Sequence, residues 1–369
     1  MSTEDAMAKR KNYGGKSARG KRGKSPSGSG ALILGLAGLA GAGWVVKSRA
    51  SDAEPIPAVA LAAPGLPLAG PGPRGAAGAA PESSAAVPPE LVASFARLAQ
   101  PDPQALVDLR RLAVEFAGSP EGRRAVEALT REREARLAEA RQIASAQPEA
   151  ALRAMTRAYL ATVDPATRRA LRPEVEALSE ALFFSPRSPG SSLTTTYAVK
   201  SGDSLSRIAG ANKTEYVMIK RLNGLPHDRI RIGQKLRLPA APTTVIIYKR
   251  DFEVILLLGD CLLRVFDCAT GAEGRTPEGR FVIGTKLVDP DWYSPDGKVY
   301  PFGSEENVLG TRWLAFENTP EHQGFGIHGT KFPDSIGTEA SMGCIRLRNP
   351  DAETVYDLVP AGSTVRIVR

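Results

Sequence analysis

The spacing of apolar residues divides the chain into an N-terminal part without a period, a helical part and a β-rich part. Between residues 89 and 184, apolar residues recur every three or four positions, which is the spacing of one helix face. From Thr244 onward, short apolar and β-branched runs alternate with Gly, Asp and Pro, a pattern typical of a sandwich or half-open barrel. We therefore expect a multidomain protein whose last domain is a mainly-β sandwich.

The helical part contains three clear helix starts. Asp102-Pro103, Ser119-Pro120 and Asp164-Pro165 each place a capping side chain before a proline that suits the first helical turn. The apolar faces that follow comprise Leu106, Leu109, Ala113 and Phe116, then Leu152, Met155, Tyr159 and Val163, then Leu171, Val175, Leu178 and Leu182. Residues 89–184 are therefore predicted to be an α-helical segment that acts as a spacer or docks a protein partner.

Two smaller patterns follow the helical segment. Residues 185–196 are a linker of Ser, Pro, Gly and Thr, and residues 197–239 then read as strand, helix, helix and strand. Asp203 or Ser204 caps the first of these helices, and Leu222 to Leu225 forms a turn. Within the β-rich part, residues 242–369, we expect strands at 245–247, 254–258, 262–266 and 281–283, a helix from Asn349-Pro350 and a final strand at 364–368.

Charge is concentrated at the N-terminus. The formal net charge is +8, but residues 1–30 hold eight Lys or Arg against Glu4 and Asp5, a net of +6, which leaves +2 for the rest. A basic face that binds nucleic acid is therefore not expected in the folded part. Residues 1–30 are also polar and lack an apolar period, so a disordered tail is predicted.

Residues 31–46 form an uncharged apolar run flanked by basic residues. A helix of this length covers about 24 Å, somewhat less than the ~30 Å hydrocarbon core of a bilayer. The run is either an uncleaved transmembrane signal-anchor or a secretory signal peptide, and the lack of a nearby small-x-small cleavage site favours the anchor. Either interpretation leaves residues 1–30 inside and the later domains outside. Residues 51–88, with eight prolines, are predicted to be an extended linker.

The three cysteines are not expected to form a disulfide. Cys261 and Cys268 are seven positions apart in one predicted strand, so they would lie about 23 Å apart. No C-x-x-C pair is present, and a zinc site is therefore disfavoured. We interpret Cys344 as the free, working thiol.

His328 lies sixteen positions before Cys344, and both residues have glycine neighbours. A thiol is a strong nucleophile only as thiolate, so it needs a nearby imidazole or another cationic environment. Gly343 permits a sharp turn and leaves backbone N–H groups near the sulfur, which could form an oxyanion hole. The alternative is a buried structural cysteine and an unrelated surface histidine.

Four sequence blocks in this order resemble the catalytic domain of the L,D-transpeptidases, which crosslink bacterial peptidoglycan. They are Thr276–Phe281, Leu309–Trp313, His328–Thr330 and Ser341–Leu347. In this family a cysteine attacks the carbonyl between the third and fourth residues of a stem tetrapeptide and releases D-alanine. The resulting thioester is resolved by an amine on a second stem, and no cofactor or metal takes part.

The resemblance also implies roles for individual residues. Cys344 would be the nucleophile, His328 the general base, and the carbonyl of Gly329 the group that orients the imidazole. The backbone N–H groups of Gly343 and Cys344 would hold the oxyanion. Arg346, Ser341 and Thr330 would contact substrate. Many members carry His where this chain has Met342 and Asn where it has Arg346, so we interpret the chain as a subtype.

Residues 197–239 resemble the LysM domain, a small βααβ unit that binds glycans containing N-acetylglucosamine. The matching loops imply glycan contacts at Gly202, Asp203, Ser204, Leu222, Asn223 and Gly224. The alternative is that these residues serve only as caps and turns. A short flexible tether would join this domain to the catalytic domain.

Together these observations predict a peptidoglycan L,D-transpeptidase of the cell envelope, anchored in the inner membrane with its catalytic domain in the periplasm. Its partners would be stem peptides, glycan strands and the membrane, and not nucleic acid. Two alternatives stay open: an L,D-carboxypeptidase or hydrolase that uses the same cysteine with water, and a non-catalytic cell-wall-binding protein.

Overall fold

The computed structural model describes residues 89–97, 102–294 and 297–369. The predicted basic tail at 1–30, the predicted anchor at 31–46 and the predicted linker at 51–88 lie outside the described residues. In the described part of the chain, no helix combines the length and the apolar character needed to cross a membrane.

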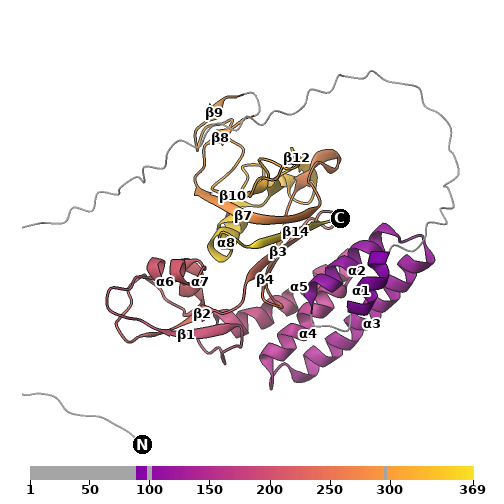
Figure 1. Cartoon of the computed structure of the whole chain (residues 1–369), viewed down its shortest axis with the longest axis horizontal. Helices are drawn as coiled ribbons and strands as arrows, with labels where there is room; N and C mark the ends of the chain where they lie inside the picture. The colour runs from indigo at the N-terminus through magenta and orange to yellow at the C-terminus, as the bar shows by residue number, and fades with distance from the viewer. Residues whose placement is uncertain (1–88, 98–101, 295–296) are drawn as a thin grey trace, which may run out of the picture. The chain divides into compact units, whose positions relative to one another are not determined.

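The helical segment follows the predicted caps. Asp102, Ser119 and Asp164 each accept a hydrogen bond from a backbone N–H of the first turn, and a proline follows each cap. The helices are α1 (Pro89–Arg97), α2 (Pro103–Glu115), α3 (Pro120–Ile143), α4 (Pro148–Ala161), α5 (Pro165–Ser179) and a closing π-helical turn, η1 (Glu180–Phe184) (Figure 1). Their buried faces include all three predicted apolar sets in part.

The second unit has the predicted strand–helix–helix–strand order. It consists of β1 (Thr194–Ala198), α6 (Leu205–Ala211), α7 (Tyr216–Leu222) and β2 (Lys235–Pro239), with β1 antiparallel to β2. Ser204 caps α6 by accepting a hydrogen bond from the N–H of Arg207. A small apolar core between the helices and the hairpin includes Val199, Leu205, Ile208, Ile219, Leu236 and Leu238.

The C-terminal domain is mainly β, as predicted. Its strands are β3 (Thr243–Tyr248), β4 (Glu253–Leu258), β5 (Cys261–Asp267), β6 (Thr270–Gly271), β7 (Gly279–Val288), β8 (Trp292–Tyr293), β9 (Val299–Tyr300), β10 (Arg312–Phe316), β11 (Gly326–His328), β12 (Glu339–Ser341), β13 (Ile345–Arg346) and β14 (Thr364–Val368). Two short 3-10 turns, η2 (Ala272–Gly274) and η3 (Pro333–Ser335), and the helix α8 (Asn349–Leu358) complete it.

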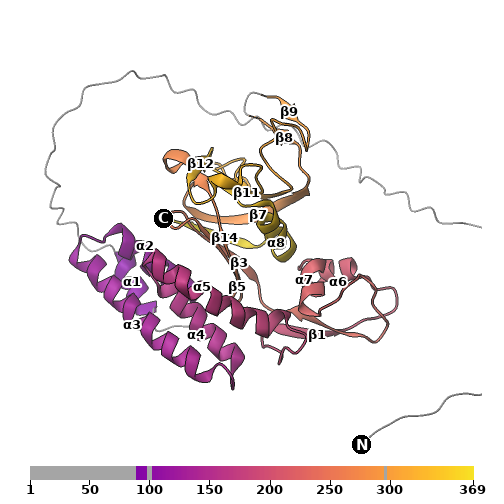
Figure 2. The same cartoon turned by 180° about the vertical axis from the view of Figure 1, so that it is seen from behind.

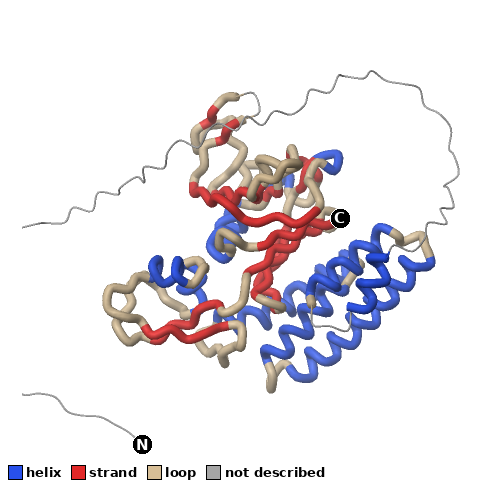
Figure 3. Tube along the Cα trace, viewed as in Figure 1, coloured by secondary structure: helices blue, strands red, loops and turns tan. Residues whose placement is uncertain are grey.

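Eight of these strands form one continuous sheet in the order β13-β11-β10-β7-β14-β3-β4-β5. Figure 3 shows the strands in red. The long strand β7 joins the two halves, because Gly279–Val282 pair with β14 and Ile283–Val288 pair with β10. The domain is therefore a single curled sheet and not the predicted sandwich of two sheets. The one long, bent strand pairs with both halves and so connects them.

The helical segment packs on the free edge of this sheet. The sheet ends at β5, whose outward-facing backbone groups would otherwise be unpaired. Side chains of α4 and α5 satisfy them: Thr156 accepts from the N–H of Leu262 at 2.9 Å, Ser179 donates to the carbonyl of Leu263 at 3.0 Å, and Glu176 accepts from the N–H of Val265 at 2.9 Å. Arg172 also donates to the Val265 carbonyl.

Buried charges fix the same interface. Arg168 of α5 is fully buried and pairs with Glu253 at 2.9 Å and with Asp251 at 3.4 Å, both at the turn between β3 and β4. Arg110 of α2 also pairs with Asp251, and both arginines stack on the ring of Tyr248. The segment 89–184 is thus packed against the chain's own C-terminal domain, which differs from the predicted spacer or docking module (Figure 2).

The βααβ unit also contacts its neighbours. Lys286 of β7 pairs with Glu215 at the start of α7 and donates to the carbonyls of Tyr356 and Val359, at 2.7 and 2.9 Å. Arg221 of α7 pairs with Asp357 of α8 at 3.2 Å. The predicted flexible tether is hydrogen-bonded at both ends, through Ala240 to Leu193 and through Pro242 to Gly259.

Candidate active site

The predicted base lies on one of two paired parallel strands, and the predicted nucleophile directly precedes the other. Strand β13 pairs with β11 so that Arg346 lies opposite His328, which places both side chains on one face of the sheet. Cys344 lies two residues before Arg346, in the bend that leads into β13.

His328 is held as a neutral base. Its side chain is buried, and Nδ1 lies 2.5 Å from the carbonyl oxygen of Gly329. Because a carbonyl can only accept, Nδ1 carries the proton and Nε2 is left to accept one. Burial lowers the pKa of His328 to about 4, although the carbonyls of Gly329 and Leu309, which favour the protonated ring, oppose this shift.

The residues Leu309 to Thr311 and Asn349 hold the peptide that orients His328. Thr311 donates its backbone N–H to Oδ1 of Asn349 at 3.3 Å, and the N–H of Gly329 donates to the carbonyl of Arg312 at 3.1 Å. A Cβ atom on Gly329 would lie 2.2 Å from Oδ1 of Asn349, so only glycine fits there. The Leu309–Trp313 block therefore acts on the base through this contact, which the sequence alone did not indicate.

Cys344 is partly exposed, and its Sγ lies 3.7 Å from the carbonyl oxygen of Gly324. Burial of the sulfur raises the pKa of Cys344 to about 11, while a hydrogen bond with the Gly326 backbone and the charge of Arg346 lower it. The raised pKa favours a neutral thiol at neutral pH, and not the thiolate that the sequence suggested. Cys261 and Cys268 are buried, and burial raises their pKa values.

Hydrogen bonds within the loop that carries Cys344 hold its conformation. The hydroxyl of Ser341 accepts from the N–H of Gly343 at 3.0 Å and donates to the carbonyl of Cys344 at 2.6 Å. The N–H groups of Gly343 and Cys344 were both expected to hold the oxyanion. The Gly343 N–H, however, is already hydrogen-bonded to the Ser341 hydroxyl. In the described part of the chain, the N–H of Cys344 has no hydrogen-bond acceptor and remains available.

The three residues expected to contact substrate differ in their surroundings. Ser341 and Thr330 are buried, and the hydroxyl of Thr330 accepts from the N–H of Phe332 at 3.0 Å, so both brace loops. Arg346 is half-buried and lies opposite His328 in the paired strands. Among the described residues its guanidinium has no carboxylate within ion-pair distance, and its buried Nε has no hydrogen-bond partner.

The predicted glycan contacts are largely structural in their present positions. Leu222 is buried in the large apolar cluster that includes the sheet of the C-terminal domain, Ser204 is the cap of α6, and Asp203 accepts hydrogen bonds from the hydroxyl of Tyr197 and the N–H of Lys200. Asn223 bonds to the backbone of Arg237 at 2.8 Å in both directions. Gly202 and Gly224 are exposed and have positive φ values of 84° and 58°, as their turns require.

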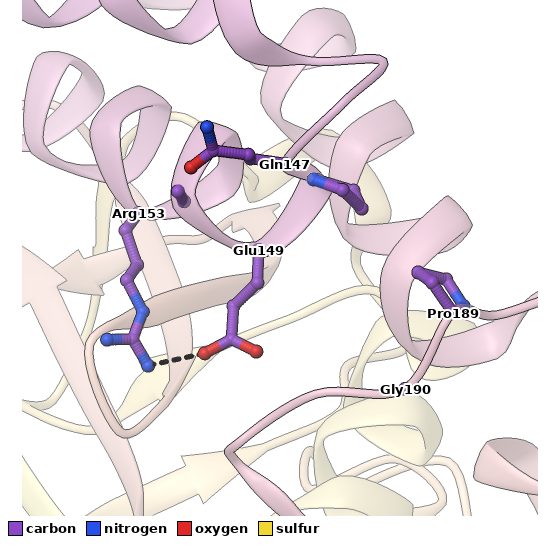
Figure 4. A pocket seen from close by; sticks show the side chains of 7 residues that line it. Gln147, Glu149, Arg153, Pro189 and Gly190 are labelled. Carbon is purple, nitrogen blue, oxygen red and sulfur yellow. Dashed lines mark hydrogen bonds and ion pairs between the residues drawn. The ribbon is translucent and has the colours of Figure 1, made fainter.

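Neither of two surface cavities contains the cysteine or the histidine. One of about 400 Å³ lies between α4 and the linker, where Figure 4 shows the ion pair of Glu149 and Arg153 beside Gln147 and Pro189. The other, of about 750 Å³, is lined by charged residues that include Lys249, Glu278 and Glu339. Within the described ranges, no group of His, Cys, Asp and Glu is arranged to hold a metal ion.

Comparison with known proteins gives two family matches. The L,D-transpeptidase catalytic domain (YkuD) matches residues 242–367, and the LysM domain matches residues 197–239. YqjB of Bacillus subtilis, named as an L,D-transpeptidase, is 35% identical over 132 residues, which are 35% of this chain and 73% of YqjB. YkuD of the same species, also named as an L,D-transpeptidase, is 30% identical over 181 residues, 47% of this chain and 99% of YkuD.

A solved L,D-transpeptidase from Mycobacterium smegmatis is 18% identical, with a TM-score of 0.30. That match covers 38% of this chain and 65% of the solved chain, just under two thirds of its length. The decisive likeness is to YkuD, whose length is covered almost completely by the region that holds Cys344 and His328. The chain therefore belongs to the L,D-transpeptidase family, with a LysM domain preceding its catalytic domain.

Proposed function

We propose that this protein forms crosslinks in peptidoglycan by acyl transfer through Cys344. The observation that supports the proposal is the pairing of β11 with β13, which sets His328 opposite Arg346 and next to the bend that carries Cys344, with the imidazole oriented by the Gly329 carbonyl. Nε2 of His328 takes the thiol proton as the sulfur attacks the carbonyl between the third and fourth residues of a stem tetrapeptide.

The later steps return the site to its starting state. The imidazolium gives its proton to the leaving D-alanine, and a thioester forms on Cys344. An amine on a second stem then attacks the thioester, a proton passes back through His328, and the thiol is released. The N–H of Cys344 stabilises the oxyanion in both halves of the reaction. The guanidinium of Arg346, which lacks an ion-pair partner among the described residues, binds a carboxylate of the stem.

The LysM domain holds the glycan strand that carries these stems, which makes the protein cell-wall-associated and active outside the cytoplasm. We also propose that residues 31–46 anchor the protein in the inner membrane, because an uncharged run follows a strongly basic tail. The catalytic domain would then work in the periplasm, within reach of newly made wall.

The test compares the full chain with Cys344→Ala on a tetrapeptide muropeptide. The unmodified chain should give an acyl-enzyme and a crosslinked dimer by mass, and the variant should give neither, while both keep the same thermal unfolding midpoint. Cys268→Ala is the matched control, since its thiol is buried and should not be needed. A tripeptide product without a crosslinked dimer would show that the protein is a hydrolase and not a transferase.

The same variant isolates the role of the LysM domain. Cys344→Ala cannot bond covalently to the wall, so any sedimentation with purified sacculi reports non-covalent binding. We expect the variant to sediment with sacculi as the unmodified chain does. Loss of sedimentation in the variant alone would show that the thioester, and not LysM, retains the protein on the wall.

A further inference from the structure

The loop that follows β6 packs closely against the loop that carries Cys344. A Cβ atom on Gly271 would lie 2.8 Å from Cα of Gly343, and a Cβ atom on Gly343 would lie 3.2 Å from the carbonyl oxygen of Arg275. Both glycines are therefore required by the close approach of the two backbones. The residue Thr276, which opens the Thr276–Phe281 block, lies at this contact and is almost completely buried.

The hydroxyl of Thr276 makes one hydrogen bond as acceptor and one as donor, and so connects the two segments. It accepts a hydrogen bond from the N–H of Gly271 at 2.7 Å and donates one to the carbonyl oxygen of Gly343 at 2.8 Å. Because Gly271 can only donate through its N–H, the hydroxyl proton must point at Gly343. Two hydrogen bonds in series polarise one another, which strengthens the bond to the Gly343 carbonyl.

The Gly343 carbonyl belongs to the same planar peptide as the N–H of Cys344. In a trans peptide the two groups point in opposite directions, so a fixed carbonyl fixes the direction of the N–H. A donor on the carbonyl also draws electron density from the peptide and makes its N–H a stronger donor. Ser341 already occupies the preceding N–H, so the Cys344 N–H is the donor that this loop offers to the substrate.

We propose that Thr276 is a positioning residue for acyl transfer: its hydroxyl aims and polarises the Cys344 N–H toward the oxyanion that forms when the thiol attacks. The inference rests on the proposed function, because it assigns the oxyanion donor of that reaction. It gives the Thr276–Phe281 block a chemical task that its sequence does not reveal.

Thr276→Val in the full chain removes the hydroxyl and keeps the shape of the side chain. Acylation of Cys344 by a tetrapeptide muropeptide should slow by about 10- to 100-fold, somewhat less than the loss of an oxyanion donor itself, with KM for the donor unchanged. Alkylation of Cys344 by iodoacetamide forms no oxyanion, so its rate should not change. A merely structural role would slow acylation and alkylation together, and that result would overturn the proposal.

Two comparisons complete the test. Thr270→Val makes the same change in the preceding strand β6, at a buried hydroxyl that has no hydrogen-bond partner in the described structure, and it should keep the acylation rate. Thr276→Ser keeps both hydrogen bonds of the hydroxyl and should retain most of the acylation rate. Thr276→Ala should lose that rate, and it replaces the valine variant in the test if the valine variant does not fold. Equal rates for Ser and Ala would overturn the role of the hydroxyl. Absence of any acyl-enzyme with the unmodified chain would overturn the proposed function as well.

Discussion

Replacing Arg168 with methionine removes a positive charge from the interface between α5 and the turn that joins β3 to β4. Methionine preserves most of the apolar stem, so the change reports the charge more than the volume. Arg168 is fully buried, and its carboxylate partners are only 5% and 7% exposed. Asp251 would keep Arg110 as a partner, whereas Glu253 would keep only the hydroxyl of Tyr159, at 3.1 Å.

The expected loss follows from the charge left behind on Glu253. Removing one partner of a buried ion pair costs about 3–5 kcal/mol, and we expect about 3 kcal/mol here because Asp251 stays paired. Arg141→Met is the matched control: its pair with Glu174 is exposed and should be worth at most about 1 kcal/mol. Urea unfolding of the full chain, followed by circular dichroism, measures both.

A second substitution shows whether the unpaired carboxylate is the cause. Glu253→Gln removes the negative charge and can still accept the hydrogen bond from Tyr159, so it should restore part of the stability lost in Arg168→Met. If Arg168→Met were no more destabilising than Arg141→Met, or if Glu253→Gln gave no recovery, the ion pairs would not hold the helical segment in place.

Three further predictions concern pH and topology. Burial lowers the pKa of His328 to about 4, so the base stays unprotonated in mild acid, and kcat/KM for muropeptide should begin to fall only as the pH approaches 4; an acid limb near pH 6.5, the ordinary histidine value, would contradict this. Burial raises the pKa of Cys344 to about 11, so alkylation by iodoacetamide should keep accelerating above pH 9. For topology, protease added to spheroplasts should digest the catalytic domain and spare an epitope placed within residues 1–30, and protection of the catalytic domain would refute the anchor.

The sequence predicted the local features well because they depend on nearby residues. Caps at Asp102, Ser119 and Asp164 precede a proline, and strands such as 254–258 are continuous apolar runs, so their structure is encoded within a few positions. The family was also accessible, through the four blocks that resemble it, whereas the pairing of His328 with Cys344 stays a prediction. The local elements and each of the family blocks are recognised from residue types that lie within a few positions of one another.

The missed features depend on contacts between distant residues. Arg168 and Glu253 are 85 positions apart, and nothing near either residue indicates that a helix would cover the edge of β5. The roles of Thr276 and Asn349 depend on which carbonyl and which N–H they meet after folding. The raised pKa of Cys344 likewise depends on burial, which outweighs the Gly326 backbone and the charge of Arg346 and cannot be inferred from sequence spacing.

The position of β14 in the sheet has a consequence for the order of folding. This last strand lies between β7 and β3 and runs parallel to β3, pairing Thr364 with Thr244 and Val368 with Tyr248. The sheet therefore cannot close until residues 364–368 have been synthesised and have paired with β3 and β7, and such long-range pairing is slow. The helices α2 to α5 are made of local contacts and are synthesised first. We expect them to form early and to shield the edge of β5 while the centre of the sheet is still open.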